Sequence, residues 1–82
     1  MSVIKFPLAT EKSIRLMESN NTLVFVVEIA AKKFDIKEAV EKQFTAKVDK
    51  VRTHITKGEK RAYVTFAKET PAIDIATNLG LM

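Results

Sequence analysis

The clearest strand-like pattern of apolar positions in the chain runs from Thr22 to Ile29. An extended strand would present on one side Leu23, Phe25, Val27 and Ile29, and on the other side Val24 and Val26. Because both sides are apolar, the pattern is typical of a central strand that is covered on both faces. We therefore expect residues 22–29 in the middle of a sheet, with Phe25 fully buried.

A second alternating pattern covers residues 46–67 and predicts a β-hairpin. Lys57-Gly58-Glu59 supplies the turn between its two strands. The positions that can face the core are Val51, Thr53 and Ile55 on the first strand and Ala62, Val64 and Phe66 on the second. The positions that then face outward are Lys50, Arg52, His54, Arg61, Tyr63 and Thr65.

Three other segments have helical periodicity. The first, Glu11 to about Ser19, follows Thr10, a residue type that is favoured as an N-cap. The second carries one apolar stripe, made of Ile36, Ala39, Val40 and Phe44. The third extends from Ala72 to Leu79.

The local sequence also predicts where the last two helices begin and end. Asp35 and Glu38 are spaced as a capping box, although the helix could instead begin earlier, near Lys32. Thr70 before Pro71 predicts an N-cap followed by proline in the first helical position. A glycine at position 80 predicts the stop.

A short strand from Val3 to Phe6, ending at Pro7, completes the element order β-α-β-α-β-β-α. The 82 residues allow one domain, spanning 1–82, and the 46% apolar fraction is enough for a core. We therefore expect a small single α+β domain, with an approximately four-stranded sheet and helices packed on it.

The distribution of charge points to a partner. The net charge is +4, and residues 1–41 contain six basic and six acidic side chains, which cancel. The segment from Lys47 to Arg61 contains six basic side chains against two acidic ones, which accounts for the whole excess. A local basic concentration favours a polyanion, usually nucleic acid, but a solvated hairpin with ordinary lysines would give the same charge.

Residues for catalysis or metal binding are few. The chain has no cysteine and one histidine, which excludes disulfides, thiolate zinc sites and clusters of histidine ligands. Its two glycines, assigned to a turn and a helix stop, leave none for a phosphate-binding loop. Glu38 and Glu41 are paired carboxylates on the wet face of a helix, next to lysines. We expect no enzyme, cofactor, metal or small-molecule substrate.

The beginning of the chain has no uninterrupted apolar run and does not resemble a signal peptide. The longest apolar stretch, Leu23 to Val27, is far shorter than the roughly 20 residues that span a membrane. We expect a cytoplasmic protein.

The outward face of the predicted hairpin carries the most suggestive chemistry. It mixes cations with the imidazole of His54 and the ring of Tyr63. Cations bind phosphates and flat rings stack on unpaired bases, so the mixture suits structured RNA. The alternative is that Tyr63 and His54 pack under a helix.

Several segments, in order along nearly the whole chain, resemble the ribosomal protein L23 family. They are residues 7–13 (PLATEKS), 21–27 (NTLVFVV), 36–41 (IKEAVE) with Phe44, 47–48 (KV), 51–53 (VRT) and 60–64 (KRAYV). The resemblance implies a four-stranded sheet with helices. It also implies a ribosome-bound place on large-subunit ribosomal RNA at the rim of the polypeptide exit tunnel, beside neighbouring ribosomal proteins.

With this resemblance, the expected RNA-binding residues are Lys12, Lys50, Arg52, His54, Lys57, Lys60, Arg61 and Tyr63. The family's exit-tunnel position also implies docking of factors that meet nascent chains, including the signal recognition particle. For this docking the matching acidic position is Glu11, with Arg15 one turn further along.

One departure concerns the hairpin. Bacterial members of the family have a long basic loop that reaches into the tunnel, whereas Lys57-Gly58-Glu59 is all that stands there in this chain. The short loop resembles archaeal members and argues against a tunnel-lining role.

Two other classes remain open at this point. A non-catalytic protein-interaction module on a small α+β scaffold would explain the interleaved elements but not the basic hairpin. A small-ligand regulatory domain should show a glycine-rich turn or a polar pocket, and the sequence shows neither.

Overall fold

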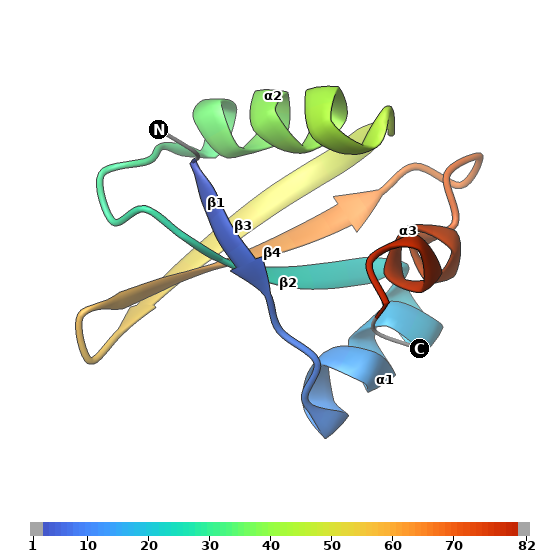
Figure 1. The fold of residues 1–82 in the computed structure, drawn as a ribbon, viewed down its shortest axis with the longest axis horizontal. Helices are drawn as coiled ribbons and strands as arrows, with labels where there is room; N and C mark the ends of the chain where they lie inside the picture. Colours follow the sequence, from blue (N-terminus) through green and yellow to red (C-terminus); the bar gives the residue numbers. More distant parts are fainter. Residues whose placement is uncertain (1–2, 81–82) are drawn as a thin grey trace.

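A computed structural model describes residues 3–80, which form one antiparallel sheet with three helices (Figure 1). The elements are β1 (Ile4–Pro7), α1 (Glu11–Asn20), β2 (Thr22–Val27), α2 (Lys33–Phe44), β3 (Val48–Thr56), β4 (Glu59–Phe66) and α3 (Ala72–Asn78). The strand order in the sheet is β1-β2-β4-β3, with every neighbouring pair antiparallel. The predicted α+β class, four-stranded sheet and element order are confirmed.

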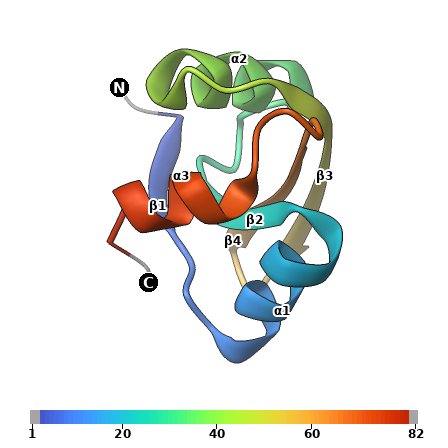
Figure 2. The same cartoon turned by 90° about the vertical axis from the view of Figure 1, so that its right-hand side faces the viewer.

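The core lies on one face of the sheet, beneath α2 and α3. All six residues of the central strand β2 are buried, and Phe25 is 0% exposed. Its ring stacks on Phe44 of α2, with ring centroids 5.7 Å apart. Ile36 of α2 and Ile75 of α3 join the same apolar cluster. In two views at right angles α1 lies on the other side of the sheet from α2 (Figures 1 and 2).

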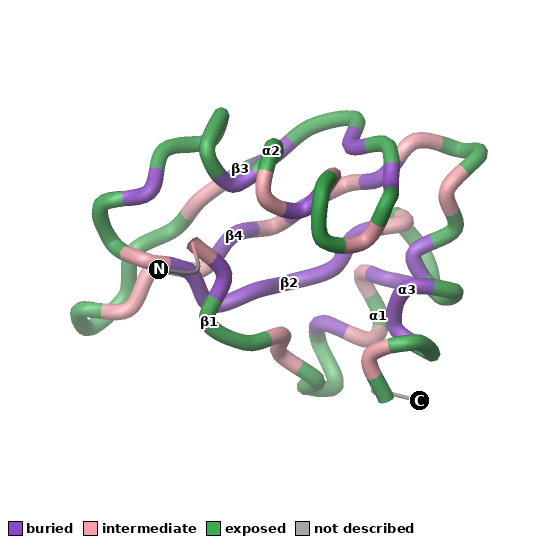
Figure 3. The backbone as a smooth tube through the Cα atoms, turned by 45° about the horizontal axis from the view of Figure 1, so that its top comes forward, coloured by how far each residue is buried: buried purple, intermediate pink, exposed green. Residues whose placement is uncertain are grey.

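The positions predicted to face the core are buried along β4, but the last predicted positions after β2 and on β3 are exposed. Ala62, Val64 and Phe66 are all buried, as expected. Ile29 and Ile55, which were expected to face the core, are 49% and 58% exposed. β2 ends at Val27, before Ile29, and the tip of the hairpin projects beyond α2 (Figures 1 and 3), which accounts for the exposure of both side chains.

The first two helices begin with polar contacts. The N-cap prediction for Thr10 is confirmed, because its Oγ1 accepts a hydrogen bond from the Ser13 backbone N–H at 3.2 Å. The Ser13 hydroxyl accepts the Thr10 N–H in return, at 2.8 Å. α2 begins at Lys33, and Asp35 accepts the N–H of Lys32 at 3.1 Å. The capping box between Asp35 and Glu38 is therefore wrong, and the earlier start is right.

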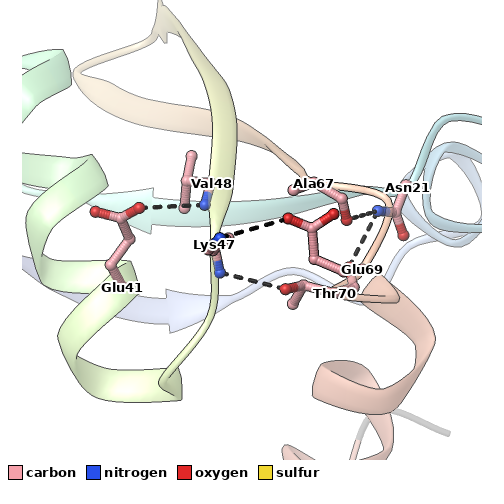
Figure 4. A network of polar contacts seen from close by, with 7 residues as sticks. All are labelled: Asn21, Glu41, Lys47, Val48, Ala67, Glu69 and Thr70. Carbon is pink, nitrogen blue, oxygen red and sulfur yellow. Dashed lines mark hydrogen bonds and ion pairs between the residues drawn. The ribbon is translucent and has the colours of Figure 1, made fainter.

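The first backbone N–H of α3 is capped by Asn21, a residue that is distant in sequence. This residue ends α1 in a left-handed conformation, with φ of 54°. Its Oδ1 accepts the N–H of Ala72 at 2.6 Å. Its Nδ2 donates to the carbonyl of Phe66 at 3.0 Å. The same nitrogen donates to the carbonyls of Ala67 and Thr70, at 3.2 and 3.1 Å (Figure 4). One amide side chain thus joins the end of α1, the end of β4 and the start of α3.

The prediction that Thr70 caps α3 is wrong. The N-cap position is Pro71, which has no side-chain acceptor, and Asn21 takes the capping role. The Thr70 hydroxyl instead accepts the N–H of Lys47 at 3.3 Å, just before β3 (Figure 4). In the same region Glu41 accepts the N–H of Val48 at 3.3 Å.

The hairpin turn is shorter than the three residues predicted for it. Thr56 pairs directly with Glu59, which is the first residue of β4. The two residues between them, Lys57 and Gly58, have φ of 50° and 77°. Positive φ at both positions is the mark of a type I′ turn, whose twist matches that of the flanking strands.

Candidate RNA-binding surface

The hairpin brings the outward-facing residues of the two strands together on the side of the sheet away from α2. Three cross-strand pairs define this surface, called the open face below: Lys50 with Thr65, Arg52 with Tyr63, and His54 with Arg61. Directly opposed side chains in such pairs have Cβ atoms about 4.5–5.5 Å apart, so the six make one continuous patch.

The middle of the open face is hollowed. A hollow of about 330 Å³ is lined by Lys12, Arg52, Thr53, His54 and Tyr63. Lys12 reaches it from the first turn of α1, so the site combines α1, β3 and β4. The expected RNA-binding residue from the first half of the chain therefore lies beside those of the hairpin.

A smaller hollow beneath α1 adjoins it. Lys12 and Tyr63 line both hollows, and Leu16 and Val24 line only the smaller one. Tyr63 is half-buried, whereas His54 is exposed. The alternative in which both residues pack under a helix therefore describes Tyr63 in part and His54 not at all.

The basic side chains that line the hollow are electrostatically unpaired. Within residues 3–80, the side chains of Lys12, Arg52 and His54 make no hydrogen bond or ion pair. None of the carboxylates in this described range lines the hollow. An anion entering it would therefore meet cations with no internal competitor.

Arg61 differs from these residues, because Glu59 neutralises it. The Arg61 Nε donates to Glu59 Oε2 at 2.9 Å, and both side chains are partly exposed. This hydrogen bond is the main reason that the pKa of Arg61 is raised above its ordinary value. The guanidinium stays protonated, but its field outside the protein is weakened by the adjacent carboxylate.

The structure separates the other predicted RNA-binding lysines from the hollow. Lys57 is exposed at the turn, and Lys50 is exposed beside Thr65. Lys60 was placed with the same group, but alternation along β4 puts it on the opposite side of the sheet. Its ammonium donates to the carbonyls of Ile29, at 3.3 Å, and Ala31, which fixes the segment between β2 and α2.

The predicted factor-docking residues lie on the outer surface of α1. Arg15 donates to Glu11 Oε1 at 2.7 Å, with side chains 76% and 81% exposed. Neither residue lines the hollow that contains Lys12. Glu11 and Arg15 thus form a separate, charge-balanced feature one residue away from the basic site.

Sequence reasoning did not include Thr53 in the site. Alternation along β3 turns its side chain to the other face, since it pairs with Ala62, so its backbone lines the hollow. A backbone contribution leaves no signal in residue type.

Two other kinds of site are absent from the described part of the chain. Residues 3–80 contain no cluster of three or more histidine, cysteine, aspartate or glutamate side chains that could hold a metal ion. Among the same residues, no helix has the length and apolar content needed to cross a membrane.

Comparison with known proteins decides the family. The sequence model described as ribosomal protein L23 matches residues 2–77. The chain belongs to the ribosomal protein L23 family. It is also 48% identical, over 80 residues, to the large ribosomal subunit protein uL23 of Methanococcus vannielii, an alignment that covers 96% of this chain and 93% of the relative. The family resemblance in the sequence is confirmed, and the chain is a structural constituent of the ribosome.

Proposed function

We propose that this L23 family protein is a structural constituent of the large ribosomal subunit and binds large-subunit ribosomal RNA through the open face and Lys12. The observation that carries the proposal is the hollow, where Lys12, Arg52 and His54 lie without internal partners around the ring of Tyr63. Unpaired cations bind phosphates, and an accessible ring suits unpaired bases. The name of the Methanococcus vannielii relative supports the assignment to the large subunit.

The proposal includes a position and partners. We place the chain at the rim of the polypeptide exit tunnel of cytoplasmic ribosomes, beside neighbouring ribosomal proteins and without a catalytic role. The two-residue turn at Lys57 and Gly58 leaves no extension that could line the tunnel. The exposed pair of Glu11 and Arg15 on α1 is the proposed docking point for nascent-chain factors such as the signal recognition particle.

The test is the salt dependence of binding to transcribed large-subunit ribosomal RNA, measured by filter binding. Each phosphate contact releases counterions, so we expect Arg52→Ala to weaken binding and lower the slope of log K against log salt by about 1. Arg61→Ala should lower it less, because Glu59 already neutralises that guanidinium. The double variant should show the flattest slope.

A matched control is Lys42→Ala on α2. Lys42 is an exposed cation, held 3.1 Å from Glu38, on the helix that covers the other side of the sheet. Its replacement should leave the slope unchanged. A double variant of Arg52 and Arg61 with the wild-type slope would show that the hairpin does not contact the RNA.

A further inference from the structure

The hollow on the open face has the dimensions of a ligand site. Its volume of about 330 Å³ lies at the lower end of the roughly 300–1,000 Å³ that is typical of small-molecule pockets. That space suits one nucleotide-sized group and is far too small for a helix or a duplex. A surface that recognised only the phosphates of a double helix would not need this concavity.

The walls offer two different kinds of contact side by side. Tyr63 lies directly opposite Arg52 across the hairpin, and His54 is one pair further along β3. Lys12 approaches from α1, where it lines both this hollow and the adjoining one with Tyr63. An aromatic ring therefore has cations beside it from two separate elements.

This arrangement matches a ligand that joins a flat ring to an anion. The three basic groups have no partner within residues 3–80, and no carboxylate lines the site, which favours a phosphate. Tyr63 is half-buried and lines the hollow, and an aromatic side chain in such a position is the usual stacking partner of an unpaired base. Bases inside a duplex are already stacked and paired, so only an unstacked nucleotide presents both parts together.

We propose that the hollow binds one unstacked nucleotide of the ribosomal RNA, with its base against Tyr63 and its phosphate between Arg52 and Lys12. This inference rests on the proposed function and makes it more specific. The open face then positions RNA through its phosphates at Lys50 and Arg52 and selects one unpaired site through the ring. The chain would favour a bulge or loop over a regular helix.

Two measurements test the proposal, both with transcribed large-subunit ribosomal RNA from the same organism. The first compares filter-binding affinities of variants at several salt concentrations. Tyr63→Leu removes the ring and should weaken binding about tenfold without changing the salt slope, because a stacked base releases no counterions. Tyr63→Phe, which keeps the ring, should restore most of the lost affinity.

The matched control for the loss of an aromatic ring is Phe34→Leu. Phe34 is 72% exposed at the start of α2, on the helix that covers the other side of the sheet, and its variant should bind like the wild type. Thermal melts confirm that each variant is folded. The second measurement needs no variant: ultraviolet crosslinking of the wild-type complex, followed by mass spectrometry, should join Tyr63 to a single unpaired nucleotide.

The outcomes separate this inference from the function on which it rests. If the wild-type chain does not bind the RNA, both fail. If binding and the effect of Arg52→Ala persist while Tyr63→Leu keeps wild-type affinity, or the crosslink falls on paired nucleotides, the inference fails and the proposed function stands. A third outcome concerns incorporation into large subunits. If Tyr63→Leu keeps its RNA affinity, but large subunits contain less of the variant and less of a neighbouring ribosomal protein, a protein side chain occupies the hollow and the inference is overturned.

Discussion

The two faces of the sheet differ in how completely their side chains are satisfied within the protein. On the face covered by α2 and α3, Phe25, Ala62 and Val64 are 0% exposed. No buried side-chain nitrogen or oxygen within residues 3–80 lacks a hydrogen-bond partner. On the open face, Arg52 and His54 are exposed side chains without partners in the same range. The covered face therefore stabilises the fold, while the polar groups of the open face remain available to bind another molecule.

The same division is visible among the basic residues themselves. Lys60, on the covered side, is bound to backbone carbonyls at the start of the segment leading into α2. Arg15, Lys42 and Lys47 each have a carboxylate partner. Net charge does not distinguish these residues from Lys12 or Arg52. What distinguishes them is the face of the sheet on which each residue lies and whether a carboxylate or carbonyl partner is present. Substitutions can test the effect of each.

The largest expected effect comes from the covered face. Phe25→Ala removes a fully buried ring that stacks on Phe44, and should cost about 3–5 kcal/mol of unfolding free energy. A domain of this size has little stability beyond that, so the free protein could unfold. Thermal melts followed by circular dichroism measure the loss.

The open-face control for that melt is Arg52→Ala. It removes a side chain with no internal partner in the described structure, and should change stability by less than about 0.5 kcal/mol. A melting temperature for Phe25→Ala within a degree or two of the wild type would break the contrast between the two faces. It would also contradict the role of β2 as the central strand.

Alternation in the sequence predicted most of this contrast. The buried series Ala62, Val64 and Phe66 and the outward pair Arg61 and Tyr63 follow directly from period two on β4. The same rule places Lys60 inward, where its ammonium donates to the carbonyls of Ile29 and Ala31. Alternation failed at Ile29 and Ile55, because burial there also depends on how far the helices extend over the sheet.

That cover is a tertiary property. Ile29 and Ile55 continue the apolar pattern but are 49% and 58% exposed, and no local signal marks where α2 stops covering the sheet. The hollow was also beyond prediction, since it depends on where the first turn of α1 places Lys12 relative to β3. Which basic side chains lack a carboxylate partner likewise depends on contacts in the folded chain, which the sequence pattern does not reveal.

The junction at Asn21 was missed for a related reason. The dipeptide Thr70-Pro71 gave a plausible local cap, whereas the actual cap comes from a side chain far away in sequence. The Thr70-Pro71 motif offers a single hydroxyl as a cap, whereas the Asn21 amide forms hydrogen bonds with three carbonyls and one N–H. The left-handed backbone of Asn21, with φ of 54°, fits the sharp change of direction between α1 and β2.

An intermediate effect is expected from Asn21→Ala. The change leaves the N–H of Ala72 without its side-chain acceptor, removes three donated hydrogen bonds and places alanine at φ of 54°. We expect a loss of about 2–3 kcal/mol, measured by urea unfolding. Salt-dependent RNA binding by the folded fraction should be unchanged, because Asn21 does not line the open face.

Two further variants divide the loss at Asn21 between its causes. Asn21→Gly relieves the left-handed strain but keeps the missing hydrogen bonds, so it should be less destabilised than alanine. Asn21→Asp keeps an acceptor for Ala72 and loses the donors. If both variants are as stable as the wild type, the junction contributes nothing and the stability of this region comes from apolar packing alone.

A small effect on stability, and the sharpest separation of fold from binding, is expected at Glu11. Its ion pair with Arg15 is 2.7 Å long but highly exposed, and such i,i+4 pairs contribute about 0.3–0.5 kcal/mol. Its position in the first turn of α1 adds a favourable helix-dipole contribution of about 0.3–1 kcal/mol. Glu11→Lys should therefore leave the fold and incorporation into ribosomes intact.

A charge at an interface rim affects specificity and association rate more than stability. We therefore expect ribosomes carrying Glu11→Lys to bind purified signal recognition particle more weakly in co-pelleting assays. Glu38→Lys is the matched control, because Glu38 forms the equivalent i,i+4 pair with Lys42 on α2. Since Arg15 loses its partner in the variant, adding Arg15→Glu restores an exposed pair of reversed polarity and tests whether the sign at position 11 or the pair itself is recognised. Equal binding by wild-type and Glu11→Lys ribosomes at low and moderate salt would reduce Glu11 to a helix-start residue and leave the open face as the single functional surface proposed for this chain.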